Sequence, residues 1–212
     1  MKCKIPEIVT EAQEAARHKR SIAENDIHFK YVDRMILLSL HDHAGFGLTR
    51  FIRYNTGAYA IGRKYITRYG EDNKEEAEYA VDSYYALRRD LRDLCGWDAE
   101  KELWSDDDLN RYKPDENSAR IRRMHENRLG YAKGIGFYVR QQMCMCAIYL
   151  CTELGWAGVR LNRVLAPVRD AYLDFLGQFL RCNPAADEDM RKRYADVRKK
   201  YNDMGYFEPE YN

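Results

Sequence analysis

The sequence predicts an all-α fold made from a tandem duplication of a roughly four-helix module, which gives a pseudo-twofold helical bundle. Three observations support this prediction. The 212 residues include only five prolines and 13 glycines, too few for many strands joined by turns. The long segments are rich in Glu, Arg, Ala, Leu and Lys, which favour helices. Finally, the chain matches itself, without a gap, when it is shifted by 110 positions.

The 110-residue offset places matching residues at helix ends and at aromatic anchors. The identical or similar pairs include Leu40/Leu150, Gly45/Gly155, Phe46/Trp156, Arg50/Arg160, Arg53/Arg163, Tyr65/Phe175, Asn73/Asn183 and Tyr84/Tyr194. A fixed period of this kind is typical of an internal repeat. We therefore divide the chain into a first helical repeat (residues 1–102), an acidic linker (103–116) and a second helical repeat (117–212). The two repeats could form separate lobes or one fused bundle.

Helix signals follow the same offset. In the first repeat we expect helices over residues 6–24, 26–44, 48–69 and 74–94. Asn73 and Asn183 precede the fourth helix of each repeat as N-caps, and Pro184 takes a first helical position. In the second repeat one long helix, from about residue 117 to 154, can replace the first two. Three glycines could break that long helix: Gly130, Gly134 and Gly136.

The stretch HDHAGFGLTRF, residues 41–51, predicts a structural turn at Gly45, Phe46 and Gly47. A glycine in the left-handed conformation often ends a helix, and an apolar residue after it folds back on the last helical turn. Gly155 and Trp156 repeat this pattern in the second half. We expect each turn to lead into a helix with one apolar stripe.

Composition limits the partners and the compartment. The formal net charge is +1, so nucleic acid or an anionic membrane would have to be bound through a local patch. The longest apolar run, MCMCAIYLC, is too short to cross a membrane, and we expect no membrane contact. No signal segment opens the chain, which favours the cytoplasm. The six cysteines contain no C-x-x-C pair, so we expect buried free thiols, and neither a metal nor a cofactor.

Tyrosine and arginine, which both favour interfaces, supply the candidate binding residues. One group comprises Arg50, Arg53 and Lys64, with the repeat counterparts Arg160 and Arg163. The other lies in ARIRRMHENR and comprises Arg120, Arg122, Arg123 and Arg128. A helix, a glycine turn and an arginine-bearing helix form the outline of a helix-turn-helix reader of nucleic acid. In the second repeat, however, Asp170 and Asp174 would face the phosphates. Alternatively, the arginines bind helix ends or acidic residues within the bundle.

The histidines before the turn offer an enzymatic alternative. His41 and His43 are two positions apart on one helix and diverge, so together they make a poor metal pair. The adjacent pair His41-Asp42 resembles that of the HD phosphohydrolases, but their upstream histidine and downstream aspartate are not found at the characteristic placements. A metal-dependent hydrolase is therefore our third hypothesis.

The run FKYVDRMILLSLHDHAGFGLTRFIRYNTGAYAIG resembles a group of small uncharacterised proteins from phages and prophages of Gram-positive gut bacteria. These share an apolar helix, a Gly-Phe-Gly turn and an arginine-bearing helix. The resemblance marks Gly45, Phe46, Gly47 and Arg50, and the second repeat departs from it at Ala157. It implies a phage accessory protein that acts inside the bacterial host cell and binds host machinery.

We found no Walker loop, dinucleotide fingerprint, serine elbow or paired-histidine zinc motif. We therefore expect a non-enzymatic phage or mobile-element accessory protein that binds a host protein or nucleoprotein complex. An inhibitor of a bacterial defence system such as CRISPR fits this description. The second hypothesis is a nucleic-acid-binding regulator that uses the arginine clusters.

Overall fold

The computed structural model describes residues 27–70 and 76–205, and it has an all-α fold with no strand in these residues. A helix over residues 27–44 comes first. The others are α2 (Leu48–Gly70), α3 (Glu76–Cys95), α4 (Ala99–Glu102), the 3-10 helix η1 (Asp107–Arg111), α5 (Ala119–Leu154), α6 (Gly158–Leu180) and α7 (Pro184–Asp203). The expected helix 6–24 and the expected cap Asn73 lie outside the described residues.

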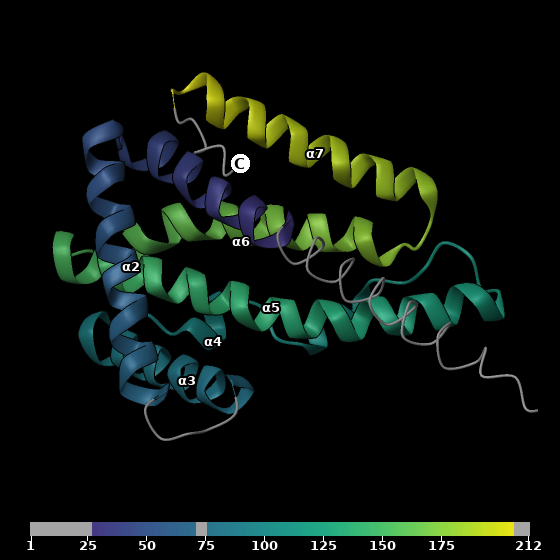
Figure 1. Ribbon diagram of the computed structural model, residues 1–212, viewed down its shortest axis with the longest axis horizontal. Coiled ribbons are helices and arrows are strands. Elements are labelled where there is room, and N and C mark those ends of the chain that lie inside the picture. Colours follow the sequence, from purple (N-terminus) through teal and green to yellow (C-terminus); the bar gives the residue numbers. More distant parts are fainter. Residues whose placement is uncertain (1–26, 71–75, 206–212) are drawn as a thin grey trace, which may run out of the picture.

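Helix α5 forms the centre of the fold (Figure 1). Its 36 residues extend over about 54 Å, and α2, α3, α6 and η1 all contact it. Helix α7 packs on α6 along the upper side of the view, and α3 lies on the opposite side of α5. Helix α2 crosses α5 near its left end in this view and also contacts α3.

The expected long helix of the second repeat is confirmed, and its three glycines do not break it. Ser118 caps its first turn by accepting a hydrogen bond from the Ile121 N–H, and Gly155 ends it. A Cβ at Gly136 would lie 3.4 Å from the indole nitrogen of Trp104, which is an ordinary van der Waals distance.

The helix bounds recur at the offset found in the sequence. Helix α2 begins and ends 110 residues before α6, and Gly45 and Gly155 have φ values of 63° and 64°. Asn183 caps α7 at the Ala186 N–H, with Pro184 in the first turn, as predicted. The two halves thus share their local structure, and a duplication as its origin stays a prediction.

Packing across the two predicted repeats joins them in one core. The helix over residues 27–44 packs on α6 and α7 of the second repeat: Ser39 Oγ donates to the Val164 carbonyl (2.6 Å) and Arg34 donates to the Tyr194 hydroxyl (2.7 Å). Reciprocally, α5 packs on α2 and α3 of the first repeat. One continuous cluster of buried side chains extends over both halves. Each half therefore completes its core with a helix from the other.

The predicted acidic linker is packed against the bundle. Trp104 and Leu109 are buried, and Tyr112 lies so close to Gly177 that a Cβ there would be 2.7 Å from its ring. Arg140 of α5 donates to the Trp104 carbonyl and pairs with Asp106 at 2.9 Å. This segment therefore packs on α5 and α6 and also connects the two halves.

Candidate binding surface

Both predicted glycine turns are confirmed as helix-ending motifs. At the end of the first helix, the Gly45 N–H donates to the His41 carbonyl (3.0 Å) and the Phe46 N–H donates to the Leu40 carbonyl (3.2 Å). Gly155 and Trp156 make the corresponding bonds at 3.1 Å each. Glycine suits these positions because the left-handed conformation brings a side-chain Cβ too close to its own backbone.

The two turns meet. The rings of Phe46 and Trp156 lie edge to face with their centroids 6.3 Å apart. Phe46 also contacts Phe51 of α2, and its side chain is only 2% exposed. This aromatic contact places the first turns of α2 and α6 next to each other. Sequence periodicity predicts each turn, but it does not show that they touch.

The first turns of α2 and α6 have an electropositive character. Neither first turn contains an acidic residue. Gly47, which precedes α2, has no side chain, and Ala157, which caps α6, makes no side-chain cap bond. The free N–H groups and the helix dipole therefore attract anions at both helix starts.

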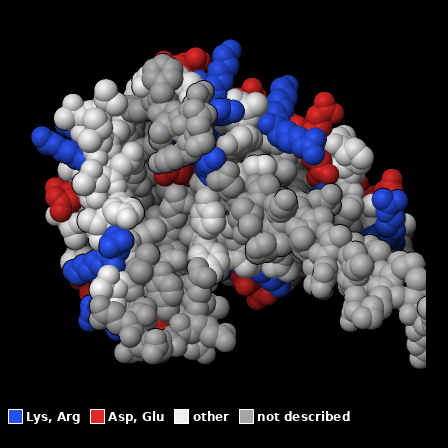
Figure 2. Space-filling view, in the orientation of Figure 1, with Lys and Arg blue, Asp and Glu red and all other residues white. Residues whose placement is uncertain are grey.

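Four exposed arginines belong to the first two turns of these helices: Arg50 and Arg53 on α2, and Arg160 and Arg163 on α6. The Arg50 guanidinium lies over the Phe46 ring, 5.8 Å from its centroid. Lys and Arg side chains lie along the left margin of Figure 2, with Asp or Glu side chains between them. We call this surface the paired-turn face and define it by Gly47, Leu48, Arg50, Arg53, Ala157, Val159, Arg160 and Arg163.

The paired-turn face also carries apolar side chains. Leu48 is 58% exposed and Val159 is 80% exposed, beside the arginines of the same helices. Exposed aliphatic groups next to arginines are typical of protein interfaces with an apolar centre and a polar rim. The face can therefore contact both an anionic and an apolar part of one partner.

The other predicted binding residues lie elsewhere. Arg120, Arg122 and Arg123 are exposed in the first turns of α5, at the opposite end of that long helix from Gly155. Lys64 follows Arg50 by 14 residues along α2, about 21 Å at 1.5 Å per residue. The structure thus separates the predicted residues into groups and brings only Arg50, Arg53, Arg160 and Arg163 to the paired turns.

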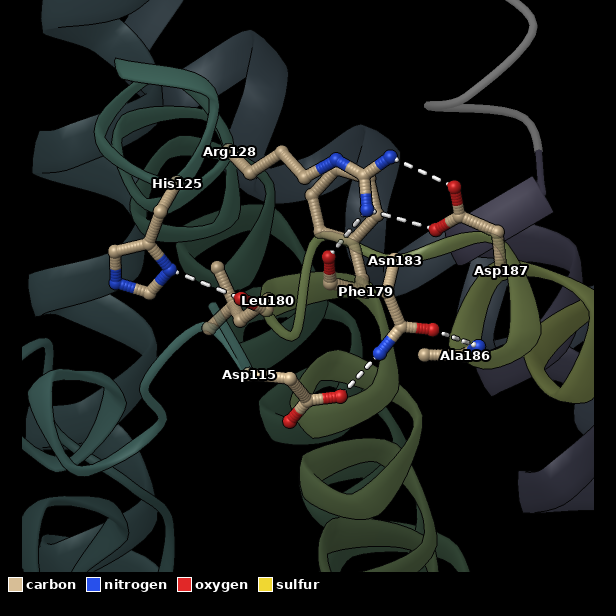
Figure 3. Close-up of polar contacts among 8 residues, drawn as sticks. All are labelled: Asp115, His125, Arg128, Phe179, Leu180, Asn183, Ala186 and Asp187. Atoms are coloured by element: carbon tan, nitrogen blue, oxygen red, sulfur yellow. Dashed lines mark hydrogen bonds and ion pairs between the residues drawn. The ribbon is translucent and has the colours of Figure 1, made fainter. Parts of the chain in front are cut away.

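Arg128 makes polar contacts within the bundle and is not free at the surface (Figure 3). Its guanidinium makes two bonds to the Asp187 carboxylate, at 2.7 and 2.9 Å, and a third to the Phe179 carbonyl at 2.6 Å. It also lies over the Phe179 ring. Nearby, His125 contacts the Leu180 carbonyl, and Asn183 bonds to Asp115 while capping α7. Arg128 therefore holds α5 to the corner between α6 and α7, so its guanidinium is engaged within the protein.

The histidine pair has no metal-binding partners among the described residues, where no group of three or more His, Cys, Asp or Glu side chains converges. His41 Nδ1 lies 2.9 Å from Asp42 Oδ1, and Lys200 of α7 binds the other carboxylate oxygen at 2.7 Å. The hydrogen bonds from His41 and Lys200 lower the pKa of Asp42. Asp42 therefore ties the end of the first helix to α7.

Cys144, Cys146 and Cys182 are buried free thiols, as predicted, whereas Cys95 and Cys151 are free thiols that are only partly buried, and Cys3 lies outside the described residues. Burial raises the pKa values of Cys144 and Cys146 to about 12. The fold brings two of these thiols together: the Cys95 and Cys151 sulfurs lie 2.8 Å apart. Cys95 ends α3 and Cys151 belongs to α5, so their approach depends on the packing of those helices and no local spacing reveals it.

Comparison of the chain with protein-family models, curated proteins and solved structures finds no match. Within residues 27–70 and 76–205, none of the helices combines the length and the apolar character that a membrane span requires.

Proposed function

We propose that this protein acts by binding, and that its paired-turn face binds a nucleoprotein complex of a bacterial host on behalf of a phage or mobile element. The observation that carries the proposal is the contact between Phe46 and Trp156. This contact joins two helix starts that lack side-chain caps and places four exposed arginines around them. Two turns from distant parts of the chain thus contribute to one surface.

The composition of the face favours a nucleoprotein. Phosphate groups bind to helix N-termini and to arginine, whose planar guanidinium matches two phosphate oxygens. Leu48 and Val159 are exposed apolar side chains. They can pack against apolar side chains of a protein, whereas a phosphate backbone offers no such partner. A blocker of a defence complex such as CRISPR requires only a face of this kind, since it acts by occupying a surface and not by turning over a substrate.

A regulator that binds nucleic acid alone is the second candidate, and α2 is the observation in its favour. Helix α2 carries five basic residues and no acidic ones in its 23 residues. In α6, by contrast, Asp174 pairs with Arg193 at 2.5 Å and Asp170 with Arg169 at 2.8 Å. The acidic residues of α6 are thus engaged within the protein, which reduces the repulsion that the sequence predicts.

Affinity capture from bacterial lysate, with and without nuclease, tests the proposal. We expect the tagged full-length protein to retain a defined set of host proteins after nuclease treatment, identified by mass spectrometry. If only nucleic acid and its associated proteins are captured, and nuclease removes them all, the regulator replaces the nucleoprotein binder. If neither protein nor nucleic acid is enriched, both binding functions are wrong.

A further inference from the structure

The face of α6 beside α5 is covered by the chain itself. Residues 97–112, which we call the covering segment, bind it through polar and aromatic contacts. The Arg169 guanidinium donates to the Glu102 carbonyl (2.8 Å), and Asn162 bonds to both Trp97 and Glu102. The Trp104 ring lies against Tyr172, with centroids 5.3 Å apart. This segment therefore shows what kind of polypeptide the helix face accepts.

The corresponding face of α2 has no such cover from the described residues. The offset of 110 relates Asn162 to Ile52 and Arg169 to Tyr59. Ile52 is 59% exposed and Tyr59 is 68% exposed. Large apolar and aromatic side chains therefore face solvent on α2 at the positions whose counterparts hold the covering segment on α6.

A cavity of about 430 Å³ lies on this face of α2, and we call it the α2 groove. Gly62 stands at the position that corresponds to Tyr172 of α6, and the absence of a side chain there lets the Met145 thioether approach α2, 3.1 Å from where a Cβ would lie. Its lining residues are Asp33, Tyr54, Asn55, Ala58, Tyr59, Gly62, Arg63, Gln142 and Met145. Aromatic rings and a thioether suit an aromatic guest, since sulfur and ring edges both pack well against rings.

The charges around the groove indicate which charged residues an occupant would carry beside its aromatic ring. Helix α2 has five basic residues and no acidic ones, and Arg63 lines the groove itself. The covering segment has six acidic and two basic residues, a net charge of −4. Asp33 is the one acidic residue among the groove's lining residues, and Gln142 donates to its carboxylate at 3.4 Å. An occupant with acidic residues on the α2 side therefore fits this groove.

We propose that the α2 groove docks a segment of a partner protein that carries a large aromatic side chain followed by acidic residues. The aromatic ring packs against Tyr59 and Met145 in the groove, and the acidic residues face Arg63 and Lys64. The covering segment of this chain is already seated on α6 with Trp104 buried, so it does not supply the occupant. The groove lies farther along α2 than the paired-turn face, and its role does not depend on the proposed function.

A synthetic peptide with the sequence of residues 97–112, labelled with fluorescein, serves as the probe. We expect its fluorescence anisotropy to rise saturably with the full-length protein. Replacing the tryptophan that corresponds to Trp104 by alanine in the peptide should weaken binding by about tenfold or more, since buried aromatic anchors dominate such interfaces.

Matched variants locate the binding on the protein. Tyr59→Ala combined with Arg63→Glu changes two exposed positions, so the fold persists, which circular dichroism verifies. This double variant should bind the peptide about tenfold more weakly or worse. The control, Tyr85→Ala combined with Arg92→Glu, makes the same two kinds of change at exposed positions of α3 and should bind like the unchanged protein.

Three results would overturn the proposal. The first is the absence of saturable binding. The second is equal binding to the Tyr59→Ala/Arg63→Glu variant and the unchanged protein, as expected if the peptide only exchanges with the covering segment on α6. The third is self-association in sedimentation equilibrium that this variant abolishes, which would assign the α2 groove to a second copy of the chain.

Discussion

Phe46 and Trp156 stand at corresponding points of two helix-ending turns, 110 residues apart in the sequence, and their rings touch edge to face. A contact between two residues related by the repeat offset is what a pseudo-twofold arrangement produces near its axis. Two further contacts are related by the same offset. Ser39 bonds to Val164, and the residues 110 positions from these two, Tyr149 and Tyr54, also contact each other.

The left-handed conformation at the first turn predicts a specific cost of substitution. Gly45→Ala should lower the free energy of unfolding by about 1–2 kcal/mol, because φ is 63° and a Cβ strains the backbone there. Gly47→Ala is the matched control, since its φ is ordinary and no atom lies within 4 Å of the added Cβ. Urea denaturation measures both, and equal losses would refute the assigned role of Gly45.

The sequence predicts these local features well because they depend on neighbouring residues. Gly45, Phe46 and Asn183 act within one helical turn of their own positions, so composition and spacing reveal them. The binding site depends on distant packing. Arg128 looks like its neighbours in ARIRRMHENR, and only the fold brings Asp187 to it from 59 positions away. The α2 groove likewise depends on Gly62 lying opposite Met145.

The exchange of helices between the halves predicts that neither half folds alone. A chain truncated after Glu102 loses α5, which packs on both α2 and α3, and leaves the helix over residues 27–44 without α6 and α7. We expect this fragment to show no cooperative thermal transition, whereas the full chain shows one. A cooperative melt of the fragment, followed by circular dichroism, would instead support two independent lobes.

Burial of His28 predicts a loss of stability in mild acid. His28 is buried among aromatic rings, and desolvation lowers its pKa to about 3 from 6.5. Between these values the unfolded chain takes up a proton that the folded chain excludes, so stability falls as the pH drops below 6.5. At pH 5 this one group should cost about 2 kcal/mol relative to neutral pH.

The comparison that isolates this effect is between the unchanged protein and His28→Gln. The variant loses the imidazole but keeps a group that can bond to the Tyr172 hydroxyl. Urea denaturation at pH 5 and pH 7.5 should show a smaller difference in unfolding free energy for the variant, by about 2 kcal/mol. An unchanged difference would mean that His28 is protonated in the folded protein.

The short distance between Cys95 and Cys151 predicts a specific disulfide under oxidising conditions. Hydrogen peroxide would accept the two hydrogen atoms of the thiols and be reduced to water while the S–S bond forms. Burial raises the pKa of Cys151, so the reaction should be slow at neutral pH and faster at higher pH, where more thiolate exists. Mass spectrometry should find a loss of two hydrogen atoms and a peptide that links residues 95 and 151.

Cys95→Ser is the control for this reaction, since it removes one partner and should abolish the linked peptide. Cys144 and Cys146 are fully buried and should still be alkylated after oxidation and unfolding. Links that form at random among the cysteines would contradict the pairing.

The measurement that tests the central claim most directly is the amount of host partner that the paired-turn face captures from lysate. Arg50→Glu combined with Arg160→Glu reverses one charge beside each turn, and Lys192→Glu combined with Lys199→Glu makes the same change at exposed positions of α7. If the two turns form one binding face, the first variant loses the captured partner and the second retains it. Capture that is equal for both variants would place the binding site elsewhere on the protein.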